Sequence, residues 1–100
     1  ATRGAIEVPL RVVRLGLESF SLIRQMVDTG NPNSITDAGV GALCARAAVL
    51  GAALNVKVNA VSLEDKVYAG AVIAESDAAM AEATRLEQEI LATVRVKMGV

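Results

Sequence analysis

Carboxylates, lysines and one tyrosine are the side chains of this chain that could transfer protons, because its 100 residues include no histidine and a single cysteine, Cys44. This composition excludes zinc sites built from Cys and His, haem held by histidine, histidine-based triads and an internal disulfide framework. The sequence has neither a phosphate-binding loop nor a cluster of metal ligands, so we expect no metal cofactor. A lone thiol is typical of a reducing compartment, so we expect a cytoplasmic protein.

The strongest candidates lie on a helix predicted over residues 35–58. Residues eighteen positions apart in a helix are separated by five whole turns and therefore point to the same side. The polar candidates on this helix fall on two opposite sides, so a compact pocket has to be completed by other helices or by another subunit. The first side carries Asp37, Gly41, Ala48, Asn55 and Asn59, and the opposite side carries Arg46 and Lys57.

Several candidates also have a purely structural interpretation. Ser34 and Asp37 have the spacing of a capping box, in which a hydroxyl and a carboxylate satisfy the first free amides of a helix. Spacing alone favours the cap as the interpretation of Asp37, with general acid–base catalysis as the alternative. Asn55 and Asn59 could hydrogen-bond a pterin-like edge of a ligand, although caps and bonds between helices are commoner uses of such amides.

A charged residue, Arg46, interrupts the apolar run 38–54. An unpaired buried charge is costly, so we expect a salt bridge from Arg46 to Glu18 or Asp28 of the preceding helix, with anion binding as the alternative. The same charge argues against a membrane span. A net charge of −1 provides no general attraction to nucleic acid or anionic lipid, so neither nucleic acid nor a membrane is an expected partner.

Apolar residues recur at spacings of three and four, which predicts an all-α fold of three long helices. The first runs from near Thr2 to Thr29 and ends at Gly30 as a left-handed cap. The second runs from Ile35 to about Val58, and the third starts at a second capping box, 62–65, and runs to about residue 97. Each rod is roughly 30 Å or longer at 1.5 Å per residue. We therefore expect one helical segment, 1–100, in a long-helix bundle completed by oligomerisation or by a missing segment.

The rows of apolar and polar residues predict which faces are buried. The first helix has two apolar rows that need partners on two sides, and a polar face that is solvated or, alternatively, faces a ligand. The small residues of the second helix predict a central, buried position. The third helix has one apolar row and an exposed charged side. The rows of the first helix are Ile6, Leu10, Val13, Leu17, Phe20 and Val27; Val8, Val12, Leu15, Leu22 and Met26; and the polar Glu7, Arg11, Arg14, Glu18, Ser21, Gln25 and Asp28. Those of the third are Val67, Ala71, Ala74, Ala78, Ala81, Leu86, Ile90 and Val94, and the charged Glu82, Arg85, Glu87, Glu89 and Arg95.

Three blocks of sequence carry a family resemblance. They are Val8-Pro9-Leu10, the stretch GNPNSITDAGVGAL over residues 30–43, and LNVKVN over residues 54–59. In this order and spacing they resemble the C-terminal half of the cyclodeaminase domain in the formiminotransferase-cyclodeaminase and methenyltetrahydrofolate cyclohydrolase family. The resemblance covers nearly the whole chain.

The resemblance implies an all-helical, dimeric or higher-order enzyme of folate one-carbon metabolism that acts on a tetrahydrofolate derivative. One branch of the family closes 5-formiminotetrahydrofolate to 5,10-methenyltetrahydrofolate and releases ammonia. The other branch interconverts methenyl- and 10-formyltetrahydrofolate. The resemblance strengthens the interpretation of Asp37 as a proton donor, with Asn31 and Asn33 as orienting groups. It also suggests Arg46 or Lys57 as ligands for the glutamate carboxylates of folate.

One feature of the family is missing from these residues. An earlier helical segment of the family carries a Pro-Gly-Gly-Gly-Ser loop, and this chain contains no such sequence. The alternative function is therefore a non-catalytic helical oligomerisation or interaction module, or an inactive fragment. This alternative predicts no affinity for folate.

Overall fold

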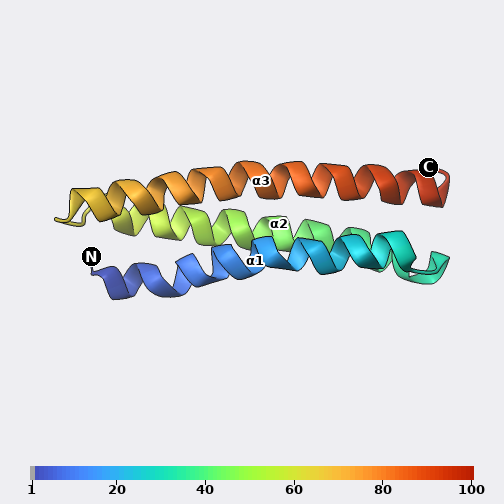
Figure 1. Cartoon of the computed structure of the whole chain (residues 1–100), viewed down its shortest axis with the longest axis horizontal. Coiled ribbons are helices and arrows are strands. Elements are labelled where there is room, and N and C mark those ends of the chain that lie inside the picture. Colours follow the sequence, from blue (N-terminus) through green and yellow to red (C-terminus); the bar gives the residue numbers. More distant parts are fainter. Residues whose placement is uncertain (1) are drawn as a thin grey trace.

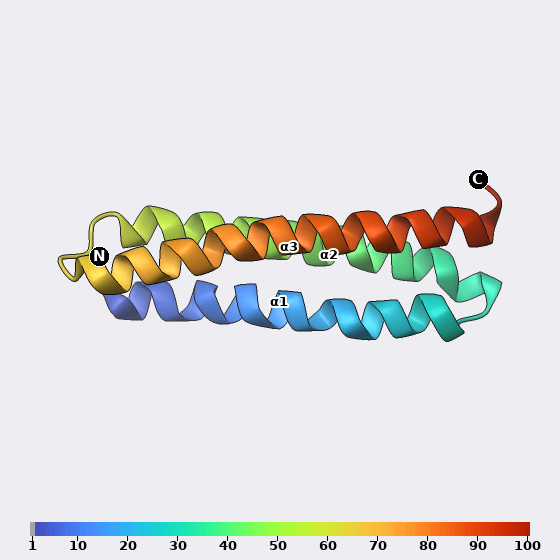
Figure 2. The ribbon, with the colours of Figure 1, turned by 45° about the horizontal axis from the view of Figure 1, so that its top comes forward.

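The computed structural model describes residues 2–100 and has three antiparallel helices, α1 (Arg3–Thr29), α2 (Pro32–Ala60) and α3 (Lys66–Met98). The helices form a rod of 52 × 18 × 15 Å in which α2 packs along both neighbours and α1 and α3 touch each other less (Figure 1). Figure 2 shows the same three helices from another side, with the short turns that join them at the two ends of the bundle. The prediction of an all-α long-helix bundle is confirmed.

The α1–α2 turn differs from its prediction. Gly30 has an extended backbone with φ −73° and ψ 155°, so the expected left-handed cap is wrong. Asn31 is the N-cap of α2, and its side-chain oxygen accepts hydrogen bonds from the amides of Asn33 and Ser34. Pro32 then occupies the first helical position, where its missing N–H costs nothing. The predicted Ser34 capping box is therefore also wrong, and α2 begins three residues earlier than predicted.

The α2–α3 turn has a similar correction. Asp65, and not Ser62, is the N-cap of α3, because its side chain accepts a hydrogen bond from the amide of Tyr68. This backbone bond, followed by the Arg3 guanidinium, lowers the pKa of Asp65. The Ser62 hydroxyl instead donates to the carbonyl of Asn59 at the end of α2. At its other end α3 stops at Gly99, whose φ of 79° is the left-handed conformation that glycine tolerates.

The hydrophobic core contains the first apolar row predicted on α1, but it excludes the early part of the apolar row predicted on α3. The first row of α1 is buried or half-buried, as predicted, and so are Leu86, Ile90 and Val94 of α3. The early part of the predicted α3 row is wrong, because alanines lie on several faces of this helix and give no contrast between inside and outside. Its five members, Val67, Ala71, Ala74, Ala78 and Ala81, are exposed, whereas Ala69, Val72, Ser76, Ala79 and Ala83 are buried.

Helix α2 is central, as predicted, but only one of its sides is buried. Val40, Leu43, Leu54 and Val58 on its outer side are between 47% and 66% exposed. By length and composition alone, α2 is also apolar enough to cross a membrane, with 33% of its most apolar window buried inside the bundle. The core helix of a globular protein passes the same test, so this result is weak evidence for a membrane span.

Alanine substitutions at two glycines, one in a tight contact and one in open space, test how closely the helices pack. A methyl group at Gly16 would lie 2.6 Å from Cγ2 of Val49, a stiff side chain, whereas a methyl group at Gly51 would meet nothing within 4 Å. Alanine is favoured over glycine inside a helix by about 0.5–1 kcal/mol. We expect Gly51→Ala to raise the free energy of unfolding by about that amount. We expect Gly16→Ala to lower it by about 1 kcal/mol, because overpacking outweighs the helix preference. Urea denaturation of both variants checks the two signs.

Candidate functional site

The predicted site residues lie at three separate places along α2. Asp37 and Asn55 are about 27 Å apart along the helix axis, because eighteen residues each rise 1.5 Å. No single folate-reacting centre can therefore contact both residues within one copy of the chain. The first place, at the α1–α2 turn, holds Asn31, Asn33 and Asp37; the second, mid-helix, holds Arg46; and the third, near the α2 C-terminus, holds Asn55, Lys57 and Asn59.

Asp37 lies one and a half turns inside α2 and is exposed to solvent. The cap interpretation of Asp37 is wrong, because Asn31 caps the helix and Asp37 is too far from its first free amides. Among residues 2–100, nothing forms a hydrogen bond or an ion pair with the Asp37 carboxylate. The structural alternative that competed with a chemical role for this residue is thereby removed.

The two asparagines near the α2 C-terminus are hydrogen-bonded to each other. Nδ2 of Asn59 donates to Oδ1 of Asn55 at 2.8 Å and to its backbone carbonyl at 2.9 Å. This arrangement fixes both amides and leaves Oδ1 of Asn59 and Nδ2 of Asn55 without a hydrogen-bond partner among residues 2–100, so both atoms can bind another molecule. Lys57 points to the opposite side, as predicted, where its Nζ lies 2.5 Å from Oδ1 of Asp77 on α3.

Arg46 pairs with α3 and not with α1, so its predicted partners Glu18 and Asp28 are wrong. Its Nε lies 3.6 Å from Oε2 of Glu87 and donates to Oγ1 of Thr84 at 3.3 Å. Glu87 is 8% exposed, and its Oε2 has no hydrogen-bond partner among the described residues. The predicted exposure of Glu87 is therefore wrong. Glu87 lies seven residues after Met80 and seven residues before Val94, so it shares an inward face of α3 with them. This spacing was the signal in the sequence that could have predicted the burial of Glu87.

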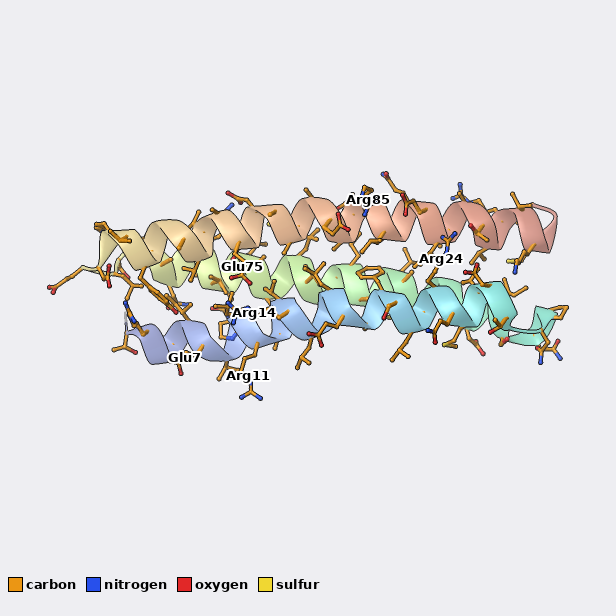
Figure 3. All side chains as sticks on the ribbon, in the orientation of Figure 1. Glu7, Arg11, Arg14, Arg24, Glu75 and Arg85 are labelled. Atoms are coloured by element: carbon orange, nitrogen blue, oxygen red, sulfur yellow. The ribbon has the colours of Figure 1, made fainter. Side chains whose placement is uncertain are left out.

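The α1–α3 groove contains a charged hollow of about 470 Å³. Arg14 donates two hydrogen bonds of 2.8 Å to the carboxylate of Glu75 across this groove (Figure 3). The polar face predicted on the first helix is therefore partly engaged with α3, and the rest is solvated. Other lining residues are Glu7, Leu10, Arg11, Tyr68, Ala71 and Val72.

A second hollow of about 300 Å³ lies farther along the same groove. Its walls are mostly apolar, and Arg24 and Glu89 are its charged lining residues. Arg85 forms ion pairs with both Glu82 and Glu89, in agreement with the charged side predicted for this helix. None of the predicted site residues lines either hollow. The remaining lining residues are Leu17, Phe20, Ser21, Leu86 and Ile90.

The Arg14–Glu75 bond makes stability depend on pH. The hydrogen bonds from Arg14 lower the pKa of Glu75 below its ordinary value. A carboxylate with a lowered folded-state pKa stabilises the native state above its unfolded-state pKa, about 4.3 for glutamate, and this contribution is lost as pH falls further. We expect Glu75→Gln to reduce the loss of stability between pH 6 and pH 3, because the pH then falls through the unfolded-state pKa of glutamate and towards the lowered folded-state pKa. Urea midpoints of both proteins at the two pH values measure this; equal losses would contradict the assignment.

Comparison with known proteins decides the family. The family model described as formiminotransferase-cyclodeaminase matches residues 1–89. The chain belongs to this family. A methenyltetrahydrofolate cyclohydrolase of Methylorubrum extorquens is 40% identical to it over 99 residues, which are 99% of this chain and 48% of that protein. The family resemblance read from the three sequence blocks is confirmed.

The chain spans about half the length of the curated relative it matches. All seven predicted site residues lie inside the matched range 1–89. Across residues 2–100, no three His, Cys, Asp or Glu side chains gather in a way that could hold a metal ion.

Proposed function

We propose that this chain takes part in the hydrolysis of 5,10-methenyltetrahydrofolate to 10-formyltetrahydrofolate. The observation that carries this proposal is the 40% identity, along 99 residues, to a protein named methenyltetrahydrofolate cyclohydrolase. The proposal extends to this chain an activity named for a relative twice its length. It assigns the predicted polar residues of α2 to binding and proton transfer.

The reaction needs a group that moves protons near a cationic carbon. Water adds to the methenyl carbon and loses one proton, which leaves a hydroxyl group on this carbon. The hydroxyl then loses its proton as the C=O bond of the formyl group forms, the bond from the carbon to N5 breaks, and N5 takes up one proton. The formyl group stays on N10, and one proton is released overall. A carboxylate suits this chemistry because it attracts the cationic substrate and can accept the proton of water. Asp37 is our candidate, since its carboxylate is exposed and has no partner in the described chain.

The amide residues supply binding groups. Asn33 lies one turn before Asp37, so it can orient a substrate at that carboxylate. Oδ1 of Asn59 and Nδ2 of Asn55 offer an acceptor and a donor to a pterin edge, but both lie too far along α2 from Asp37 to contact the same substrate within one copy of the chain. Of the two candidate cations, Arg46 and Lys57, we assign Lys57 to the glutamate carboxylates of folate. Its ion-pair partner Asp77 is more exposed than Glu87, the partner of Arg46.

Cyclodeaminase activity is the second candidate, because the matching family model bears that description. An absorbance assay separates the two activities, since 5,10-methenyltetrahydrofolate is the coloured species in both. The purified chain is incubated with this compound and, separately, with 5-formiminotetrahydrofolate. We expect accelerated loss of the methenyl absorbance in the first reaction. Its appearance in the second reaction alone would establish cyclodeaminase activity, and no change in either would favour the non-catalytic module.

A further inference from the structure

The second hollow of the α1–α3 groove has the composition of a small-molecule site. Apolar side chains from both helices form most of its walls, and two of them, Phe20 and Ile90, are almost fully buried. Pockets for small ligands are mostly apolar and carry a few polar groups that orient the ligand. Their volumes are about 300–1,000 Å³. A hollow of about 300 Å³ therefore suits a ligand of one or two rings.

Arg24 brings a positive charge to this hollow. Within residues 2–100 it makes one ion pair, with Nε 3.5 Å from Oδ2 of Asp28 on the same helix, and it donates no hydrogen bond. Both side chains are about half exposed, so this ion pair contributes little to stability. Figure 3 shows the Arg24 side chain reaching from α1 towards α3. The N–H groups of its guanidinium are therefore available to an acceptor in the hollow.

The first hollow of the same groove shows how such a cation is otherwise used. There Arg14 donates two hydrogen bonds to Glu75 on the facing helix, so its guanidinium is already engaged. The second hollow also has a carboxylate on the facing helix, Glu89. Arg85, on the same helix as Glu89, holds that carboxylate at 2.7 Å. Arg24 therefore lacks the partner across the groove that Arg14 has.

The charges around the second hollow balance each other, so its carboxylates do not exclude a bound anion. An anion at Arg24 replaces Asp28 as its partner. Asp28 keeps a positive charge nearby, because Nζ of Lys97 lies 3.3 Å from its backbone carbonyl oxygen. The cations of this neighbourhood are Arg24, Arg85 and Lys97, and its carboxylates are those of Asp28, Glu82 and Glu89.

We propose that the second hollow binds a small aromatic carboxylate. The ring of the ligand packs against the apolar walls, where Phe20 offers an aromatic contact, and its carboxylate accepts hydrogen bonds from the Arg24 guanidinium. A rigid ring suits the hollow better than a flexible chain, because it loses less conformational entropy on binding. None of the seven residues predicted for the folate site lines this hollow. The ligand is therefore distinct from the substrate of the proposed hydrolysis.

Fluorine NMR of 4-(trifluoromethyl)benzoate, titrated with the full chain, tests this site without an activity assay. We expect saturable binding with a dissociation constant of about 1 mM or lower, the range of a small ligand in a small pocket. The neutral compound 4-(trifluoromethyl)benzamide keeps the ring but lacks the negative charge, and we expect it to bind about tenfold more weakly. Absence of saturation, or equal binding of the two compounds, would overturn the proposal.

Three variants locate the bound benzoate. Arg24→Met removes the cation and keeps the stem of the side chain, and Ser21→Phe fills the hollow and leaves Arg24 in place. We expect each to raise the dissociation constant about tenfold. Arg11→Met is the control, because Arg11 is exposed on the same helix but does not line the second hollow; its dissociation constant should stay within about twofold of the original.

All three positions are exposed, so the variants should keep the fold, and circular dichroism of each protein checks this. Equal effects of Arg24→Met and Arg11→Met would show that the benzoate responds to general charge and would overturn the proposal. Unchanged affinity in Ser21→Phe would place the ring outside the second hollow, with the same consequence.

Discussion

Asp37→Asn is expected to lower the rate of 5,10-methenyltetrahydrofolate hydrolysis by a factor of about 10² to 10⁴, the usual contribution of a general acid–base group. Asparagine has nearly the same shape as aspartate but cannot carry the proton. The fold should be unaffected, because Asn31 and not Asp37 caps α2 and the Asp37 side chain is exposed. Methenyl absorbance gives the rate, and circular dichroism gives the helix content.

Asp28→Asn is the matched control for this variant. Asp28 lies at the same end of the bundle and is exposed, and within residues 2–100 its carboxylate makes only a 3.5 Å ion pair with Arg24 in the last turn of α1. We expect its rate to stay within about twofold of the original, since an exposed ion pair of this kind is worth little. Loss of helix content in Asp37→Asn would return Asp37 to a structural role, and an unchanged rate would remove it from the chemistry.

Arg46→Met is expected to destabilise the bundle by about 2–3 kcal/mol, because it leaves a buried carboxylate without its counter-charge. Glu87 is almost fully buried between α2 and α3, whereas Arg46 is a little over one-third exposed. Methionine keeps the length and the packing of the arginine stem, so the lost charge accounts for the effect. The urea midpoint of unfolding, measured at pH 7, gives its size.

The double variant Arg46→Met/Glu87→Met separates charge from packing. Removing both partners of a buried pair is often neutral, because the cost of desolvating both charges disappears with the attraction between them. We expect the double variant to recover most of the stability that the single variant loses. A double variant as unstable as the sum of both single variants would show that packing, and not the ion pair, dominates at this position.

The helices could be predicted from the sequence, but their caps could not. Rows of apolar residues at helical spacing identify a helix over many turns, so the three rods were found with small errors at their ends. A helix cap depends on a single residue. The predicted capping boxes begin at Ser34 and Ser62, and in each case a residue three positions away caps the helix instead. Asn31 followed by Pro32 starts α2 before Ser34, and Asp65 starts α3 after Ser62.

The candidate site was predictable as a set of residues but not as a place. The helical repeat correctly put Asp37 and Asn55 on one side of α2 and Arg46 on another. Spacing on one helix cannot show which neighbour completes a site, so the Arg46 partner was sought on α1 while Glu87 of α3 provides it. Alanine-rich sequence also hides which face of α3 is buried, because small apolar residues occur on all its sides.

The loss of 5,10-methenyltetrahydrofolate absorbance tests most directly the central claim, that this chain takes part in hydrolysis of this compound with Asp37 as the proton-transferring carboxylate. We expect the unaltered chain to accelerate this loss, and Asp37→Asn to remove most of the acceleration while it keeps its helix content. No acceleration by the unaltered chain, or equal rates for the two proteins, would contradict the claim.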